Sequence, residues 1–128
     1  MAVTKILLID DERDLCMVMK LNLERTGRYA VETAYSGTEG VEKAKGTAFD
    51  LVITDFQMPG MDGAAVLRAL KVMRPRAPVV LCSVYHDDVT RIPDTLQQEA
   101  DGLISKPIDH MQLQRTVQDA LAKAADSG

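Results

Sequence analysis

Short runs of consecutive apolar residues alternate along the chain with stretches in which apolar residues recur every three or four positions. The first pattern is typical of strands buried on both faces of a sheet, and the second is typical of amphipathic helices. The apolar runs predict strands at 5–10, 49–55, 78–83 and 103–105, and an alternating, half-buried pattern predicts an edge strand at 29–35.

Three of the predicted helices have recognisable ends. The helical spacing after the first strand stops at Gly27, which is a common helix terminator. Ser36 is followed three residues later by Glu39, the spacing of a capping box, and opens a short helix. Asp62 is expected to cap a helix that carries Leu70 and Met73 on its inner face and that Pro75 ends.

The starts of the last two helices are not equally clear in the sequence. The stretch 88–100 contains Pro93, so a helix there either begins near Pro93 or is kinked at it. Asp109 is expected to cap the final helix, in which Leu113, Val117 and Leu121 share one face. Five strand–helix units in succession predict an α/β fold with a parallel sheet between helices, whose ligand site lies at the carboxyl ends of the strands.

The composition is that of an ordinary globular protein. The 128 residues predict one domain over 1–128, with a core at about 4–124, because 46% of them are apolar and 27% charged. A net charge of −4 without a basic cluster argues against direct binding of nucleic acid. The sequence contains no apolar run long enough to span a membrane and no signal-peptide pattern at its start, which predicts a cytoplasmic protein without membrane contact. Cys16 and Cys82 lack zinc-ligand spacing and are expected to be buried thiols.

Polar side chains follow four of the five predicted strands. Asp10, Asp11 and Glu12 follow the first, Asp55 ends the third, Ser83 ends the fourth and Lys106 follows the fifth. Carboxylates that converge on one crevice repel one another, and their oxygens are the ligands that Mg²⁺ prefers. The sequence therefore predicts a magnesium site for phosphoryl chemistry, with Asp55 as the nucleophile.

A charge count indicates how such a site would respond. The three aspartates carry −3, which Mg²⁺ and Lys106 together balance. Esterification of Asp55 would remove one charge and add about −2, which leaves the site near −1. Lys106 and the Ser83 hydroxyl are expected to face the phosphoryl oxygens.

At this point the sequence resembles the receiver domains of two-component response regulators. The motifs that carry the resemblance are the sequence IDD at 9–11, the block DLVITDFQMPGMDG at 50–63, Ser83, and Lys106 with Pro107. The resemblance implies a flavodoxin-like, doubly wound (βα)5 fold with five parallel strands in the order 2-1-3-4-5. It also implies a cis bond before Pro107 and a Mg²⁺ ion held by Asp10, Asp11, Asp55 and the backbone carbonyl of Gln57.

The resemblance also implies a role and partners. Asp55 would accept a phosphoryl group from a histidine kinase or a phosphotransfer protein, in a self-catalysed, Mg²⁺-dependent reaction that changes a partner-binding surface. The protein would then be a signalling switch and not a turnover enzyme. Its downstream output protein is unknown, and the chain would act as a monomer or as a phosphorylation-dependent dimer.

The switch region departs from the family pattern. Most relatives carry an aromatic residue where this chain has Leu103, and the usual phenylalanine after the lysine–proline pair is Ile108. Leucine prefers burial, so if Leu103 faces the gap under the fourth helix, it is expected to stay inward in both states and to respond weakly to phosphorylation. We therefore expect the signal to travel through residues 84–88 and the helix that contains Pro93.

Two other classes of protein are compatible with parts of this pattern. A metal-dependent phosphohydrolase of the haloacid dehalogenase type would also form an aspartyl phosphate, but it carries an acid two residues after its nucleophile, where this chain has Gln57. A receiver that binds partners without being phosphorylated would not need Asp10, Asp11, Asp55 and Lys106 to be intact. A phosphorylation assay distinguishes the last alternative from the switch.

Overall fold

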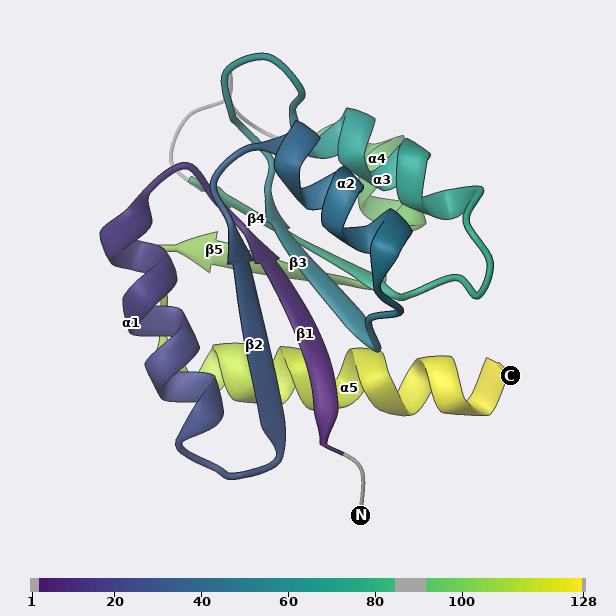
Figure 1. Cartoon of the computed structure of the whole chain (residues 1–128). Helices are drawn as coiled ribbons and strands as arrows, with labels where there is room; N and C mark the ends of the chain where they lie inside the picture. Colours follow the sequence, from purple (N-terminus) through teal and green to yellow (C-terminus); the bar gives the residue numbers. More distant parts are fainter. Residues whose placement is uncertain (1–2, 85–91, 128) are drawn as a thin grey trace.

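A five-stranded parallel sheet lies at the centre of the computed structural model, with helices on both of its faces (Figure 1). The structure describes residues 3–84 and 92–127. The strands are β1 (Thr4–Ile9), β2 (Tyr29–Ala34), β3 (Leu51–Asp55), β4 (Val79–Val84) and β5 (Gly102–Lys106). The helices are α1 (Arg13–Glu24), α2 (Gly37–Gly46), α3 (Gly63–Lys71), α4 (Asp94–Glu99) and α5 (His110–Ser127).

The strand order is β2-β1-β3-β4-β5, as the family resemblance implied. β1 pairs with both β2 and β3, and β4 pairs with β3 and β5, all in parallel. The register sets Asp55 opposite Cys82, and Ser83 opposite Ser105. The carboxyl ends of the central strands therefore meet at one edge of the sheet, where the sequence predicted the site.

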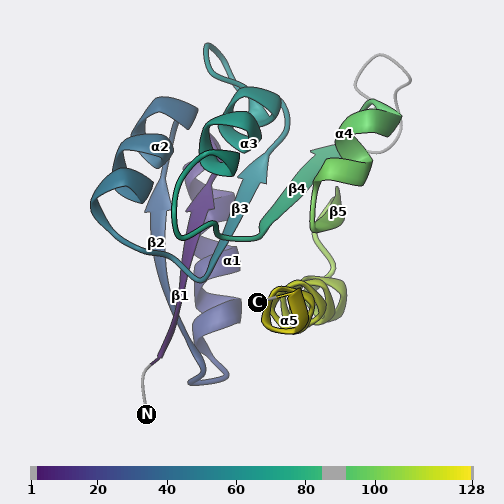
Figure 2. The ribbon, with the colours of Figure 1, turned by 90° about the vertical axis from the view of Figure 1, so that its right-hand side faces the viewer.

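Alternating side chains of each strand build two separate cores. In β1, Ile6 and Leu8 join the core beneath α1 and α5, whereas Leu7 and Ile9 join the core beneath α2, α3 and α4. The view in Figure 2 shows α5 on one side of the sheet and α2 and α3 on the other. Because both faces are covered, β3 is buried along its whole length and most of β1 and β4 is buried as well, which is why these strands appear in the sequence as continuous apolar runs.

The predicted helix caps are present. The Ser36 hydroxyl accepts a hydrogen bond from the Glu39 amide at 3.1 Å, and the Glu39 carboxylate accepts one from the Tyr35 amide at 2.8 Å. The Asp62 carboxylate accepts from the Ala65 amide at 3.0 Å. Asp109 caps α5 by accepting from the backbone amides of the first turn.

Two helices differ from the sequence prediction. α4 begins at Asp94, directly after Pro93, so the alternative in which the helix starts near this proline is correct. The earlier part of the predicted stretch, residues 88–91, lies outside the described residues. α3 ends at Lys71, so Met73, expected on its inner face, follows the helix and contacts the core from the loop. Within the described ranges, the structure has no helix that is long and apolar enough to cross a membrane.

Candidate functional site

Two aspartates are buried at the carboxyl edge of the sheet. Asp55 is the last residue of β3 and is 6% exposed, and Asp10 directly follows β1 and is 2% exposed. Asp11 lies beside them but faces solvent. One carboxylate oxygen from each of the three lies within 4.8 Å of the others, so the residues predicted as metal ligands do converge.

Lys106 brings a positive charge to this cluster from the end of β5. Its Nζ lies 3.0 Å from Asp10 Oδ2, 3.1 Å from Glu12 Oε1 and 3.4 Å from Asp55 Oδ2. The lysine side chain is only 10% exposed and its partners Asp10 and Asp55 are buried, so solvent screens these two ion pairs weakly. Three carboxylates are thus joined through one ammonium group.

The environment of the buried aspartates opposes their ionisation. Burial raises the pKa of Asp55 to about 6, with the negative charge of Asp10 as the next contribution, while Lys106 acts in the opposite direction. Burial also raises the pKa of Asp10, against the hydrogen bonds from the Glu12 amide and Lys106. A single lysine does not compensate for two buried carboxylates and a third beside them.

The lysine and the cysteines respond to the same charges. Burial by itself lowers the pKa of Lys106, but the hydrogen bond to Asp10 and the charges of Asp55 and Asp10 outweigh it and raise that pKa above its usual value. Burial raises the pKa of the Cys16 thiol to about 12 and that of Cys82 further. Both cysteines are buried free thiols, as expected, and they are inert at neutral pH.

Close backbone packing holds the end of β3 in place. The Phe56 amide donates to the Cys82 carbonyl at 2.7 Å, and the Gly63 amide donates to the Phe56 carbonyl at 2.8 Å. A Cβ atom at position 63 would lie 2.7 Å from the Asp55 carbonyl oxygen. Gly63 is therefore required where the first turn of α3 meets the end of β3.

The chemistry of the cluster fits a hard divalent cation. Its ligand atoms are carboxylate oxygens, and two of the carboxylates are buried, which is the main cause of their raised pKa values. Asp11 opens the cluster to solvent, which leaves room for the water ligands that Mg²⁺ retains.

The remaining predicted residues surround the cluster at different distances from its centre. Ser83 is half-buried, one position beyond the β4 residue that pairs with Asp55. Gln57 lies exposed in the loop that follows β3. The Lys106–Pro107 bond is cis, as the resemblance implied.

The expectation that Leu103 stays inward is wrong. Its side chain is 39% exposed, whereas the next residue, Ile104, is 2% exposed and belongs to the core under α1 and α5. Successive side chains of a strand alternate between the two faces of the sheet. β5 is an edge strand, and the face that carries Leu103 is incompletely covered. Val84 is exposed as well, and the rest of the segment expected to carry the signal, 85–88, lies outside the described residues.

Sequence reasoning missed two contacts near the site. Glu12 was grouped with the strand-end acids without a role, yet it binds Lys106 from the opposite end of the chain. The Arg13 guanidinium stacks over the Tyr35 ring, 4.3 Å from its centroid. Neither contact follows a local spacing rule, because each joins residues from different strand–helix units.

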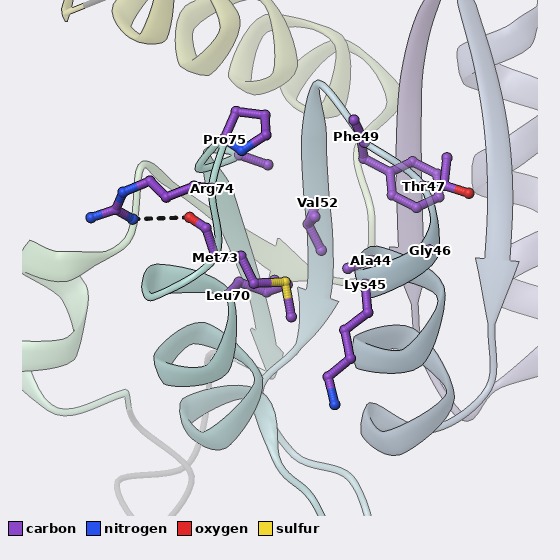
Figure 3. Close-up of a pocket in the computed structure, with 12 residues that line it drawn as sticks. Ala44, Lys45, Gly46, Thr47, Phe49, Val52, Leu70, Met73, Arg74 and Pro75 are labelled. Atoms are coloured by element: carbon purple, nitrogen blue, oxygen red, sulfur yellow. Dashed lines mark hydrogen bonds between the residues drawn. The ribbon is translucent and has the colours of Figure 1, made fainter.

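A second concave region lies at the opposite edge of the sheet. It is a hollow of about 330 Å³ between the ends of α2 and α3, with Val52, Leu70 and Met73 among its apolar lining residues (Figure 3). The charged ends of Lys45 and Arg74 point away from it, and Arg74 donates to the Met73 carbonyl at 2.9 Å. None of the residues predicted for the site lines this hollow.

Comparison with known proteins identifies the family. The sequence profile described as "Response regulator receiver domain" matches residues 6–118. The chain belongs to this family. Receiver domains are signalling domains of two-component response regulators, and the buried acidic cluster at the strand ends fits the phosphoacceptor site of such a domain.

Curated relatives are longer proteins. The transcriptional regulatory protein ZraR of Salmonella typhimurium is 32% identical over 123 residues, which are 96% of this chain and 27% of ZraR. The response regulator ArlR of Staphylococcus saprophyticus is 31% identical over 106 residues, 83% of this chain and 47% of ArlR. The receiver therefore spans between about a quarter and half of these relatives.

Solved structures agree over nearly the whole chain. A response regulator receiver domain protein from Clostridium thermocellum superposes with a TM-score of 0.85 at 30% identity, covering 98% of this chain and 100% of that one. The chemotaxis protein CheY4 of Vibrio cholerae superposes with a TM-score of 0.79 at 28% identity, covering 93% and 99%.

Proposed function

We propose that this receiver is a phosphorylation-dependent switch in which Asp55 accepts a phosphoryl group from a histidine kinase or a phosphotransfer protein. The observation that carries the proposal is the position of Asp55: its buried carboxylate lies between a lysine and two further carboxylates. Membership of the receiver family supports the same role. A downstream output partner, a monomer or phosphorylation-dependent dimer, and a cytoplasmic location belong to this proposal.

The transfer follows from the chemistry of a carboxylate nucleophile. An Asp55 oxygen attacks phosphorus, the bond from phosphorus to the donor nitrogen of phosphohistidine breaks, and its electron pair remains on the imidazole. Lys106 already lies 3.4 Å from an Asp55 oxygen, so it can donate to a phosphoryl oxygen without a long movement. The Ser83 hydroxyl would donate to another. The domain itself supplies these groups, so it would catalyse its own phosphorylation and dephosphorylation.

Asp10, Asp11, Asp55 and the Gln57 carbonyl would hold a Mg²⁺ ion. Bound there, Mg²⁺ would neutralise charge on the transferred oxygens and relieve the repulsion among the carboxylates. Asp11 would bind it directly, and Asp10 would support it from the buried side.

The direct test is covalent labelling. The protein is incubated with Mg²⁺ and a small acyl phosphate, and the adduct is trapped with borohydride and located by mass spectrometry. We expect one adduct, at Asp55, which Asp55→Asn abolishes and Asp62→Asn, a change in the same segment, preserves. Full labelling of the Asp55→Asn protein would refute the proposal, and no labelling of the wild type would favour a receiver that works without phosphate.

A second test concerns the response to phosphorylation. Lys106→Ala is expected to be labelled but not to change shape, because the compact charge that senses the phosphoryl group is missing. Hydrogen exchange of residues 92–124 is compared with and without the phosphate mimic beryllofluoride. A response like that of the wild type in this variant would show that Lys106 is not the sensor.

A further inference from the structure

Glu12 occupies the position that begins α1 but does not serve the helix. It is the N-cap residue, with extended backbone angles, and its side chain makes no capping hydrogen bond. Serine, threonine, aspartate and asparagine are the usual residues there, because their short side chains reach the free amides of the first turn. The Glu12 carboxylate reaches Lys106 instead, 94 positions away in the sequence.

The contact with Glu12 uses one of the three N–H donors of Lys106. An ammonium has three such donors, and the three carboxylates of Asp10, Glu12 and Asp55 surround Nζ. The distance to Glu12, 3.1 Å, is shorter than the 3.4 Å to Asp55. The backbone of Glu12 is also fixed at the site, because its amide donates to Asp10 Oδ1 at 2.9 Å.

Stability alone gives a poor account of this arrangement. The Glu12 side chain is 63% exposed, and ion pairs with an exposed partner contribute little to folding. A short side chain at this position would accept hydrogen bonds from the backbone amides of the first turn of α1, which the Glu12 side chain does not do. Glu12 is a poor capping residue for α1, and its side chain instead contacts the lysine of the acidic cluster. This combination indicates a role in the function of the site.

We infer that Glu12 is a positioning residue that holds Lys106 in its resting geometry and thereby restrains phosphorylation of Asp55. Its carboxylate takes the Lys106 donor that a phosphoryl oxygen would take. It also adds a negative charge beside a site whose net charge would fall to about −1 on phosphorylation. The inference rests on the proposed function, because it concerns the rate and stability of that same modification.

Removal of this one charge should therefore favour the modified state. Glu12→Gln keeps the size of the side chain but forms a weaker hydrogen bond with Lys106. The contact is part-exposed, so we expect a gain of about two- to five-fold in the rate of labelling by a small acyl phosphate. The affinity for beryllofluoride should rise by a similar factor.

Asp14→Asn is the matched control. Asp14 is exposed in the first turn of the same helix, its replacement changes the net charge equally, and it is not among the carboxylates that contact Lys106 in the described part of the chain. The full chain is used for each protein, in Mg²⁺ and at one ionic strength. Labelling rates, beryllofluoride titrations and the NMR signal of the Lys106 ε-methylene group are measured, together with thermal unfolding.

The expected result is a faster reaction and a shifted Lys106 signal in Glu12→Gln, with both unchanged in Asp14→Asn. A wild-type rate in Glu12→Gln would overturn the inference, as would an equal gain in Asp14→Asn, which would indicate general repulsion of an anionic donor. An unmoved Lys106 signal would also overturn it. Failure of the proposed function would appear separately, as a wild-type protein that is not labelled at Asp55.

Discussion

The two edges of the sheet hold opposite kinds of residues, although the same strands run between them. At the carboxyl edge, Asp10, Asp55 and Lys106 are buried with their charges. At the amino edge, apolar side chains such as Val52 and Leu70 surround a hollow, and the cations nearby point away (Figure 3). The first edge concentrates charge around buried carboxylates, whereas the second is lined largely by apolar side chains.

The comparison shows how the protein folds despite the unfavourable burial of charge at the site. Burying like charges at one edge opposes folding, as the raised pKa values of Asp10 and Asp55 show. The two apolar cores along the strands offset that cost by removing apolar surface from water. Changes at the amino edge should therefore alter stability alone, whereas removal of the buried Asp55 carboxylate at the carboxyl edge, in the absence of Mg²⁺, should raise stability while it abolishes the proposed function.

The largest effect on stability is expected from Leu70→Ala at the amino edge. Leu70 is 3% exposed and lines the hollow, so its truncation enlarges a space that is already present. We expect the free energy of unfolding to fall by about 3 kcal/mol. Chemical denaturation measures this, with Val72→Ala, at a site 79% exposed just beyond the same helix, as the control. Beryllofluoride binding below the unfolding transition should be retained, and its loss would break the separation of the two edges.

The opposite sign is expected from Asp55→Asn in buffer free of Mg²⁺. The pKa of Asp55 rises from 3.8 in a reference peptide to about 6 in the folded protein. Between these values the unfolded chain releases the proton first, so the free energy of unfolding falls as pH rises from about 4 to 6. At pH 7.5 the variant should be more stable than the wild type by about 3 kcal/mol, and near pH 3.5 the difference should vanish.

Denaturation curves at several pH values test this prediction. Asp119→Asn, on an exposed part of α5, is the matched control and should not reproduce the gain. A gain in Asp55→Asn that persists unchanged at pH 3.5 would contradict the electrostatic cause.

A smaller effect is expected from Mg²⁺ and its loss in Asp11→Ala. Ligand that binds only the folded state stabilises it, by about 1.4 kcal/mol at ten times the dissociation constant. Asp11 supplies one of the converging carboxylates, so its removal should weaken Mg²⁺ binding and abolish most of this stabilisation. Calorimetric titration and thermal unfolding with Mg²⁺ measure both. Asp14→Ala is the control, and equal Mg²⁺ affinities of Asp11→Ala and the wild type would remove Asp11 from the site.

The smallest effect is expected from filling the hollow with Ala44→Met. Ala44 lines it from α2, and methionine is a good helix former that adapts to irregular spaces. We expect a gain of about 0.5 kcal/mol in the free energy of unfolding, without a change in labelling of Asp55. Ala122→Met makes the same replacement on an exposed position of α5 and should gain nothing. Equal gains in both variants would show that the hollow is not filled.

The parts of the fold that sequence reasoning predicted well are those with strong local signals. Buried strands such as β3 and the caps at Ser36, Asp62 and Asp109 each follow a rule that links neighbouring residues to local structure. The convergence of Asp10 and Asp55 followed from the parallel sheet, because β1 and β3 end at the same edge.

The residues that were predicted poorly depend on tertiary context. Leu103 is exposed because β5 is an edge strand and α4 is short, and neither fact is encoded by leucine itself. Glu12 binds Lys106 because the fold brings the start of α1 next to the end of β5. Both features require the positions of helices relative to the sheet, which spacing rules do not supply.

The charge cluster draws its members from distant parts of the chain, and this has a consequence for the newly synthesised protein. Asp10 and Asp55 are made well before Lys106, and closure of such long loops is a late and slow event in folding. Until β5 docks on β4, the acids face each other without their cation. A truncated or half-folded copy therefore carries Asp55 but lacks the positive charge that pairs with it. The proposed phosphorylation would thus depend on the docking of the last strand.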